Sequence, residues 1–136
     1  MSARAARRVA VAWVTANETR AVRVGEAAAI VDPDGAPAGW LVPVTAGEEL
    51  VGFVQVSQAG AFLRHAAFPH PVDAQRWLDP AHVLRVARSK APRGARLSAP
   101  VLTYDRAPSR IVWAVRARHA GKDLTIFVAG DHAYTG

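Results

Sequence analysis

The stretch Trp40–Leu63, WLVPVTAGEELVGFVQVSQAGAFL, predicts three consecutive strands joined by two short turns. Apolar residues recur at every second position in the first segment, and residues 50–57 are apolar on both faces, which is typical of a strand inside a sheet. Gly47 and Gly60 mark the turns. Pro43 lacks a backbone N–H, so the first segment is expected at a sheet edge or a bulge.

The residues before this stretch predict a helix, a short strand and a turn. Residues 2–22 are rich in alanine and free of glycine and proline, and a helix there should end near Gly25. Its apolar stripe is expected to contain Val9, Ala12, Trp13 and Ala16. A short strand at residues 27–32 leads into Asp32-Pro33-Asp34-Gly35, which has strong turn chemistry.

The second half of the chain predicts another helix followed by strands. Residues 69–73 are expected to be irregular and to separate the halves, and Asp79-Pro80 predicts a helix start, with residues 92–94 ending that helix. Val83, Leu84 and Ala87 form its expected buried stripe. Strands are then predicted at residues 100–104, 111–118 and 124–129 and around Tyr134.

An internal similarity links the two halves. Trp40, Gly47, Leu50 and Phe53-Val54 parallel Trp113, Gly121, Leu124 and Phe127-Val128, with one extra residue in the second turn. A repeat of this kind indicates two copies of one unit, although two apolar hairpins can also share such spacing by chance. The chain is therefore expected to form a single compact α+β domain over residues 1–136. Two helix-plus-antiparallel-meander halves within it, 2–68 and 71–136, are one interpretation of the pattern.

The first half resembles the PepSY domain and related cystatin-like propeptide modules. The resemblance rests on the helix, the strand with Asp32-Pro33-Asp34-Gly35, then WLVPV and GEELVGFVQVSQAGAFL. It implies helices packed on a curled antiparallel sheet, and a role in binding or restraining a protein partner, often a peptidase. Residues 56–63 lack the acidic residue of the family's closing turn, and residues 55–59, QVSQA, depart from the Gln-x-Val-x-Gly hairpin of cystatins.

Composition narrows the possible chemistry. The 136 residues include no cysteine, which excludes disulfides, thiolate nucleophiles and cysteine-ligated zinc. The apolar run Val9–Val14 is too short for a membrane span, which needs about 20 residues, or for a signal-peptide core of about seven. No membrane span is therefore expected, and a cytoplasmic location is expected if Met1 is the native start.

The net charge of +6 lies entirely in the second half. Six basic residues balance six acidic ones through Phe68, and eleven basic residues face five acidic ones after it. This asymmetry suggests either an ordinary solvated basic face, which we favour, or a site for nucleic acid or another polyanion. The residues of the second interpretation are Arg85, Arg88, Lys90, Arg93, Arg96, Arg116 and Arg118.

The aromatic residues have two interpretations. They could interleave with arginines as a stacking platform for single-stranded nucleic acid, or they could pack in the core. We expect core positions, because large aromatic residues at every second position of a half-buried sheet usually point inward. The residues concerned are Trp40, Phe53, Trp113 and Phe127.

Catalytic and metal-binding patterns are weak. The five histidines, His65, His70, His82, His119 and His132, include no pair with a recognised ligand spacing. The serines, Ser57, Ser89, Ser98 and Ser109, lack a nucleophile-elbow context, and Asp32 and Asp34 are better explained as turn formers than as an acid/base pair. Neither enzyme activity nor a cofactor or metal is therefore expected.

The sequence thus predicts a non-catalytic protein-binding or peptidase-regulating module, with binding to nucleic acid or another polyanion as the alternative. A protein partner would bind at a sheet edge, by strand addition, or at the tips of the two hairpins. The residues at those tips are Gly47, Glu48, Glu49, Gly121 and Lys122.

Overall fold

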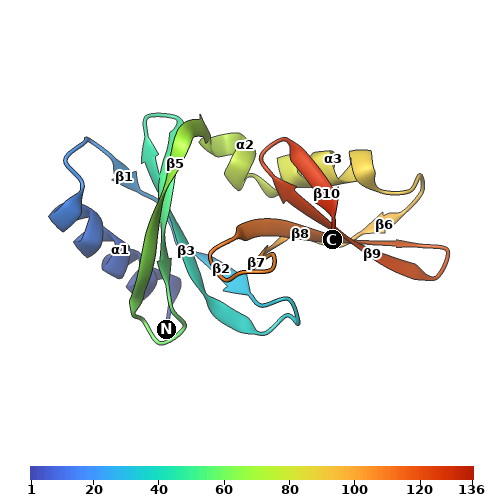
Figure 1. Cartoon of the computed structure of the whole chain (residues 1–136), viewed down its shortest axis with the longest axis horizontal. Helices are drawn as coiled ribbons and strands as arrows, with labels where there is room; N and C mark the ends of the chain where they lie inside the picture. The colour runs from blue at the N-terminus through green and yellow to red at the C-terminus, as the bar shows by residue number, and fades with distance from the viewer. The chain divides into compact units, whose positions relative to one another are not determined.

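The computed structural model describes all 136 residues, and the chain has an α+β fold in which three helices accompany mostly antiparallel strands (Figure 1). The chain divides into two compact units, Met1–Ala74 and Gln75–Gly136. None of the helices has the length and apolar character that crossing a membrane requires. The elements of the first unit are α1 (Ala3–Asn17), β1 (Arg23–Val24), β2 (Ala28–Val31), β3 (Pro37–Ala46), β4 (Glu49–Val56) and β5 (Phe62–Asp73).

Helix α1 begins where the sequence predicts and ends earlier. The Ser2 hydroxyl caps its start by accepting a hydrogen bond from the backbone N–H of Ala5 (3.1 Å). The helix ends at Asn17 and not near Gly25, because the segment in between packs as strand β1. Val22 and Val24 lie against the hydrophobic core in that extended conformation, and this tertiary packing overrides the helical preference of the alanine-rich sequence.

The buried face of α1 also differs from the expected stripe. Ala6, Ala10 and Val14 are buried against the sheet, whereas Ala12 and Ala16 are exposed. Val9 and Trp13 pack at the margin of this contact. Small alanine side chains let the helix axis approach the sheet closely. Close packing against the valines of the strands, and not the size of the helix side chains, therefore decides which face of α1 is buried.

Strand β3 is central in the first unit, and β5 is the outer strand. The order is β2-β3-β4-β5, and β1 pairs with β3 beyond the end of β2. The expected edge position for the segment of Pro43 is therefore wrong, while the alternative of a bulge is met one residue later, where the register of β3 with β4 shifts between Val44 and Thr45. Pro43 instead lies between the stretches of β3 that pair with β2 and with β1, where its missing N–H leaves no ladder bond unmade on that side.

The passage predicted to be irregular, residues 69–73, belongs to β5. The pairing of β5 with β4 resumes at Leu50–Val72 and Glu49–Asp73 after a register shift. Pro69 lies within the shifted part of the strand, so the ladder is interrupted where the proline could not contribute a donor. The strand thus tolerates residues that normally end one.

The second unit contains α2 (Ala74–Leu78), α3 (Pro80–Lys90), β6 (Arg96–Leu97), β7 (Val101–Tyr104), β8 (Ile111–His119), β9 (Lys122–Ala129) and β10 (His132–Thr135). The helix start at Asp79-Pro80 is confirmed, because the Asp79 carboxylate accepts a hydrogen bond from the N–H of Ala81 (3.0 Å). Val83 and Ala87 are buried as predicted, and Leu84 is partly buried. The strand order is β7-β8-β9-β10, with β6 on β8.

Candidate binding surfaces

The outer strand β5 carries exposed large apolar side chains beside an open sheet edge. Its side opposite β4 carries no further strand, because β5 ends the strand order. Phe62 and Leu63, at the start of β5, are 39% and 44% exposed, although both are large apolar residues. An unpaired backbone edge beside exposed apolar side chains favours association with another extended chain.

An aromatic stack adjoins this edge. The Trp13 ring of α1 lies parallel to the ring of Phe62, with centroids 5.5 Å apart and an interplanar angle of 6°. It also stacks on His65, at 4.4 Å and 23°. We call Trp13, Phe62, Leu63 and His65 the β5 patch. Such flat, partly exposed rings bind apolar or aromatic partner groups with little loss of side-chain entropy.

The electrostatics of the patch keep His65 neutral near pH 7. Burial lowers the pKa of His65 below its usual value, the Glu18 carboxylate partly opposes this shift, and the Arg20 cation adds to it. Arg20 in turn bonds Glu18 (3.2 Å), and this hydrogen bond lowers the pKa of Glu18. A neutral imidazole leaves the patch mainly apolar, which suits an apolar partner side chain.

The predicted hairpin-tip residues are exposed, one group in each unit. Gly47 and Glu48 form the turn between β3 and β4, and Glu49 is the first residue of β4. The carbonyl of Glu48 accepts a hydrogen bond from the N–H of Ala74 (3.0 Å), so this tip is braced. Gly121 lies in the turn between β8 and β9, and Lys122 begins β9. The two tips carry charges of opposite sign and therefore cannot both select the same charged partner group.

The predicted polyanion-binding residues do not share one face of the second unit. Arg96 pairs directly with Arg118 across β6 and β8, and Arg116 lies two residues from Arg118, so these three share a face. Leu97, the neighbour of Arg96 in β6, points to the other side, where it lines a groove with Arg85 and Arg88 of α3. Lys90 and Arg93 lie at and beyond the end of α3 and are exposed.

Two of these arginines already bond the protein itself. Arg88 donates to the carbonyl of Ala95 (2.6 Å), and Arg118 forms an ion pair with Asp123 (3.2 Å). The ion pair offsets the charge of Arg118, whereas the bond of Arg88 to a neutral carbonyl leaves its charge in place and occupies one of its donors.

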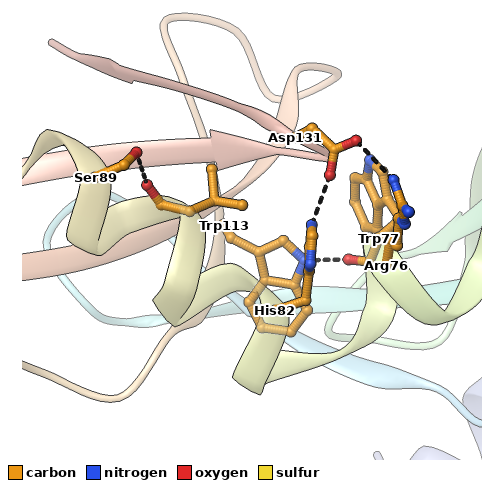
Figure 2. Close-up of polar contacts among 7 residues, drawn as sticks. Arg76, Trp77, His82, Ser89, Trp113 and Asp131 are labelled. Atoms are coloured by element: carbon orange, nitrogen blue, oxygen red, sulfur yellow. Dashed lines mark hydrogen bonds and ion pairs between the residues drawn. The ribbon is translucent and has the colours of Figure 1, made fainter.

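A polar cluster in the second unit ties a turn to the helices. Asp131, between β9 and β10, bonds His82 Nε2 (2.8 Å) and Arg76 (3.2 Å), and Trp113 Nε1 donates to the carbonyl of Trp77 (2.8 Å) (Figure 2). The Ser89 hydroxyl in the same view donates to the carbonyl of Val86 (2.6 Å) on its own helix. The His82–Asp131 pair therefore holds the turn between β9 and β10 against α3. No group of three or more His, Asp or Glu side chains gathers in an arrangement that could hold a metal ion.

The aromatic residues divide between core and surface. Phe53 and Trp113 are buried, as predicted, and Trp40 packs against the core of the first unit. Phe127 is partly buried, and its ring lies tilted by 34° against that of Tyr134, with centroids 5.4 Å apart. It lies on the face of β9 opposite the buried Ile126 and Val128, so the core prediction does not hold for Phe127.

Sequence reasoning did not identify the β5 patch. The signal was the adjacent pair Phe62-Leu63 directly after a glycine turn, because neighbouring strand residues point to opposite faces and one large apolar side chain is then left outside. The contribution of Trp13 depends on long-range packing. No family model, curated protein or solved structure matches this chain.

Proposed function

We propose that this chain is a non-catalytic protein-binding module that pairs an extended segment of a partner protein with strand β5. The observation that carries the proposal is the edge of β5 that no further strand covers, beside the exposed Phe62 and Leu63. Strand addition supplies affinity through main-chain hydrogen bonds, and the neighbouring side chains supply specificity.

The binding segment of β5 has a defined length. Residues 62–68 precede Pro69 and Pro71, which lack N–H donors and limit strand addition beyond this point. A partner segment of about seven residues would therefore pair here, with an apolar side chain against Trp13 and Phe62. A peptidase is the partner class that the PepSY-like resemblance of the first half implies.

The fold supports a second part of the proposal, that the two units are copies of one helix-plus-meander module. Elements in the second unit start or end 73 residues after their counterparts in the first. The pairs are the ends of α1 and α3 (Asn17 and Lys90), β1 and β6 (starting at Arg23 and Arg96), and β2 and β7 (starting at Ala28 and Val101). Trp113 likewise follows Trp40 by 73 residues.

Strand registers support the duplication as well. Trp40 pairs with Val56 across β3 and β4, and Trp113 pairs with Val128 across β8 and β9. Both hairpins have two-residue turns, closed by Ala46–Glu49 and by His119–Lys122. The predicted extra residue in the second turn is therefore wrong.

The length difference between the hairpins lies in β4. The register shifts there, so that Val51 is the extra residue of the first unit. Gly47 then corresponds to Ala120 and not to Gly121, while the two tryptophans remain equivalent.

Affinity capture with matched variants tests the binding proposal. The wild-type chain, F62S/L63S and the control V101S would be immobilised and exposed to a cell extract, and the captured proteins identified. Val101 is a suitable control because it is an apolar strand residue of similar exposure (45%) in the second unit. A specific partner should bind the wild type and V101S but not F62S/L63S, and retention by F62S/L63S would contradict the proposal.

The polyanion alternative gives a different outcome in a salt titration. Binding to single-stranded DNA or heparin through Arg96, Arg116 and Arg118 should weaken steeply as salt rises, because phosphate or sulfate neutralisation releases counterions. R116Q/R118Q should then lose retention while F62S/L63S keeps it. That pattern would support the polyanion function and count against binding at β5.

A further inference from the structure

A hollow lined by arginines lies between α1 and the segment that contains β1. Its volume is about 870 Å³, and Arg4, Arg7, Arg23, Val24, Glu26 and Ala27 are among the residues that line it. A groove of about 320 Å³ shares Arg7, Arg23 and Val24 with the hollow and continues along the helix over Val11, Val14 and Val22. Cationic groups therefore adjoin an apolar floor, in a volume typical of small-molecule sites.

The arginines of the hollow are not neutralised by the protein. Arg7 donates from Nε (3.3 Å) and Nη2 (3.0 Å) to the carbonyl of Val24, which fixes its guanidinium and leaves the Nη1 donors for a ligand. Arg4 and Arg23 are exposed and form no ion pair in the structure. Glu26 is the one carboxylate that lines the hollow. Three guanidinium groups against one carboxylate favour an anion.

We infer that this hollow binds a small ligand that carries a carboxylate on a short apolar chain. The carboxylate would accept hydrogen bonds from the arginines, and the chain would lie along the groove against Val11, Val14 and Val22. The arginines would bind the carboxylate end of the ligand, and the valines of the groove would bind its apolar end. The site is separate from the β5 patch, so it does not depend on the proposed function.

The second unit has a groove at the positions that correspond to the groove of the first unit. Leu84, Arg88 and Leu97 line a groove of about 380 Å³ and lie 73 residues after Val11, Thr15 and Val24. Arg88 of that groove donates to the carbonyl of Ala95 (2.6 Å). In the first unit the large arginine-lined hollow adjoins the groove, so one ligand is expected to span the two.

Titration with octanoate, followed by amide NMR shifts of the full chain, tests the inference. Octanoate should bind saturably at one site with a Kd on the order of 1 mM, because small flexible ligands gain little free energy per atom. The largest shifts should fall on residues 22–27. Octanol and acetate, which lack the charge and the chain respectively, should each bind at least about tenfold more weakly.

Variants locate the site. R4Q/R23Q should weaken octanoate binding at least about tenfold, since two charge-assisted hydrogen bonds are lost. The control R96Q/R116Q makes the same change in net charge outside the hollow and should bind as the wild type does. Equal binding by R4Q/R23Q and the wild type, with an unchanged unfolding midpoint, would overturn the inference. Equal binding of acetate and octanoate would reduce the site to adventitious anion binding and would overturn it too.

Discussion

Replacing Trp113 by phenylalanine should destabilise the chain more than replacing Trp40, because only the Trp113 indole donates a hydrogen bond. Trp113 is 8% exposed, and its Nε1 donates to the carbonyl of Trp77 at 2.8 Å. Nε1 of Trp40 is buried without a hydrogen-bond partner. Phenylalanine removes the N–H at both positions, so W113F breaks a bond whereas W40F removes an unsatisfied donor.

The expected magnitudes follow from these contacts. The smaller ring leaves a cavity at either site, which costs about 1 kcal/mol. W113F also loses the hydrogen bond to the carbonyl of Trp77, so its total cost should be about 2–3 kcal/mol. Removing the unsatisfied N–H of Trp40 is worth about 1–3 kcal/mol, so W40F should lie between neutral and about 2 kcal/mol more stable than the wild type.

Denaturant unfolding followed by far-UV circular dichroism measures both variants without relying on the fluorescence that each substitution removes. Hydrogen exchange, read separately for residues 1–74 and 75–136, assigns the change to a unit. The expected difference is about 2 kcal/mol or more, with W113F the less stable. W40F as destabilising as W113F would refute the reasoning, because cavity formation would then outweigh the hydrogen bond.

Three further predictions concern the pH response, a close backbone contact and a helix cap. The pKa of His65 is lower in the folded chain than in the unfolded chain, so the unfolded state binds the proton more readily. The contribution of His65 to the free energy of unfolding should therefore be fully present above the usual histidine pKa and decrease as the pH falls below that value. Urea unfolding of H65F should show a smaller loss of stability between pH 7.5 and 5 than the wild type shows. A Cβ at Gly52 would meet the carbonyl oxygen of Ala66, so G52A should lower the free energy of unfolding by about 2–3 kcal/mol in thermal or denaturant unfolding. G47A, at an open turn with φ +60°, should lower it by about 1 kcal/mol, and equal losses in the two variants would contradict this ranking. D79A should destabilise by about 1 kcal/mol through loss of the α3 cap, and D79N should keep most of that stability, so equal losses in the two variants would argue against capping.

Turn and cap chemistry made much of the fold predictable. Asp79-Pro80 begins α3, and Asp32 holds its turn by accepting hydrogen bonds from the N–H groups of Asp34 and Ala36 (both 2.9 Å). These signals are local, because the side chain bonds a backbone group a few residues away. The long strands β4 and β8 were predictable for a related reason, since their apolar patterns extend over many residues.

The features that escaped prediction depend on distant contacts. Strands β1 and β6 have two residues each, too few for any periodicity, and exist because β3 and β8 pair with them. β5 continues past two prolines because a register shift with β4 accommodates them. The β5 patch escaped prediction for the same reason, since the stack of Trp13 on Phe62 joins residues far apart in the sequence.

Hydrogen exchange of β5 in the presence of a captured partner tests the central claim most directly. Strand addition requires new main-chain hydrogen bonds along residues 62–68, and amides bonded in this way exchange slowly. The account predicts slowed exchange on binding in this segment, with F62S/L63S neither binding nor protected. Protection confined to another surface, with the exchange of residues 62–68 unchanged, would contradict it.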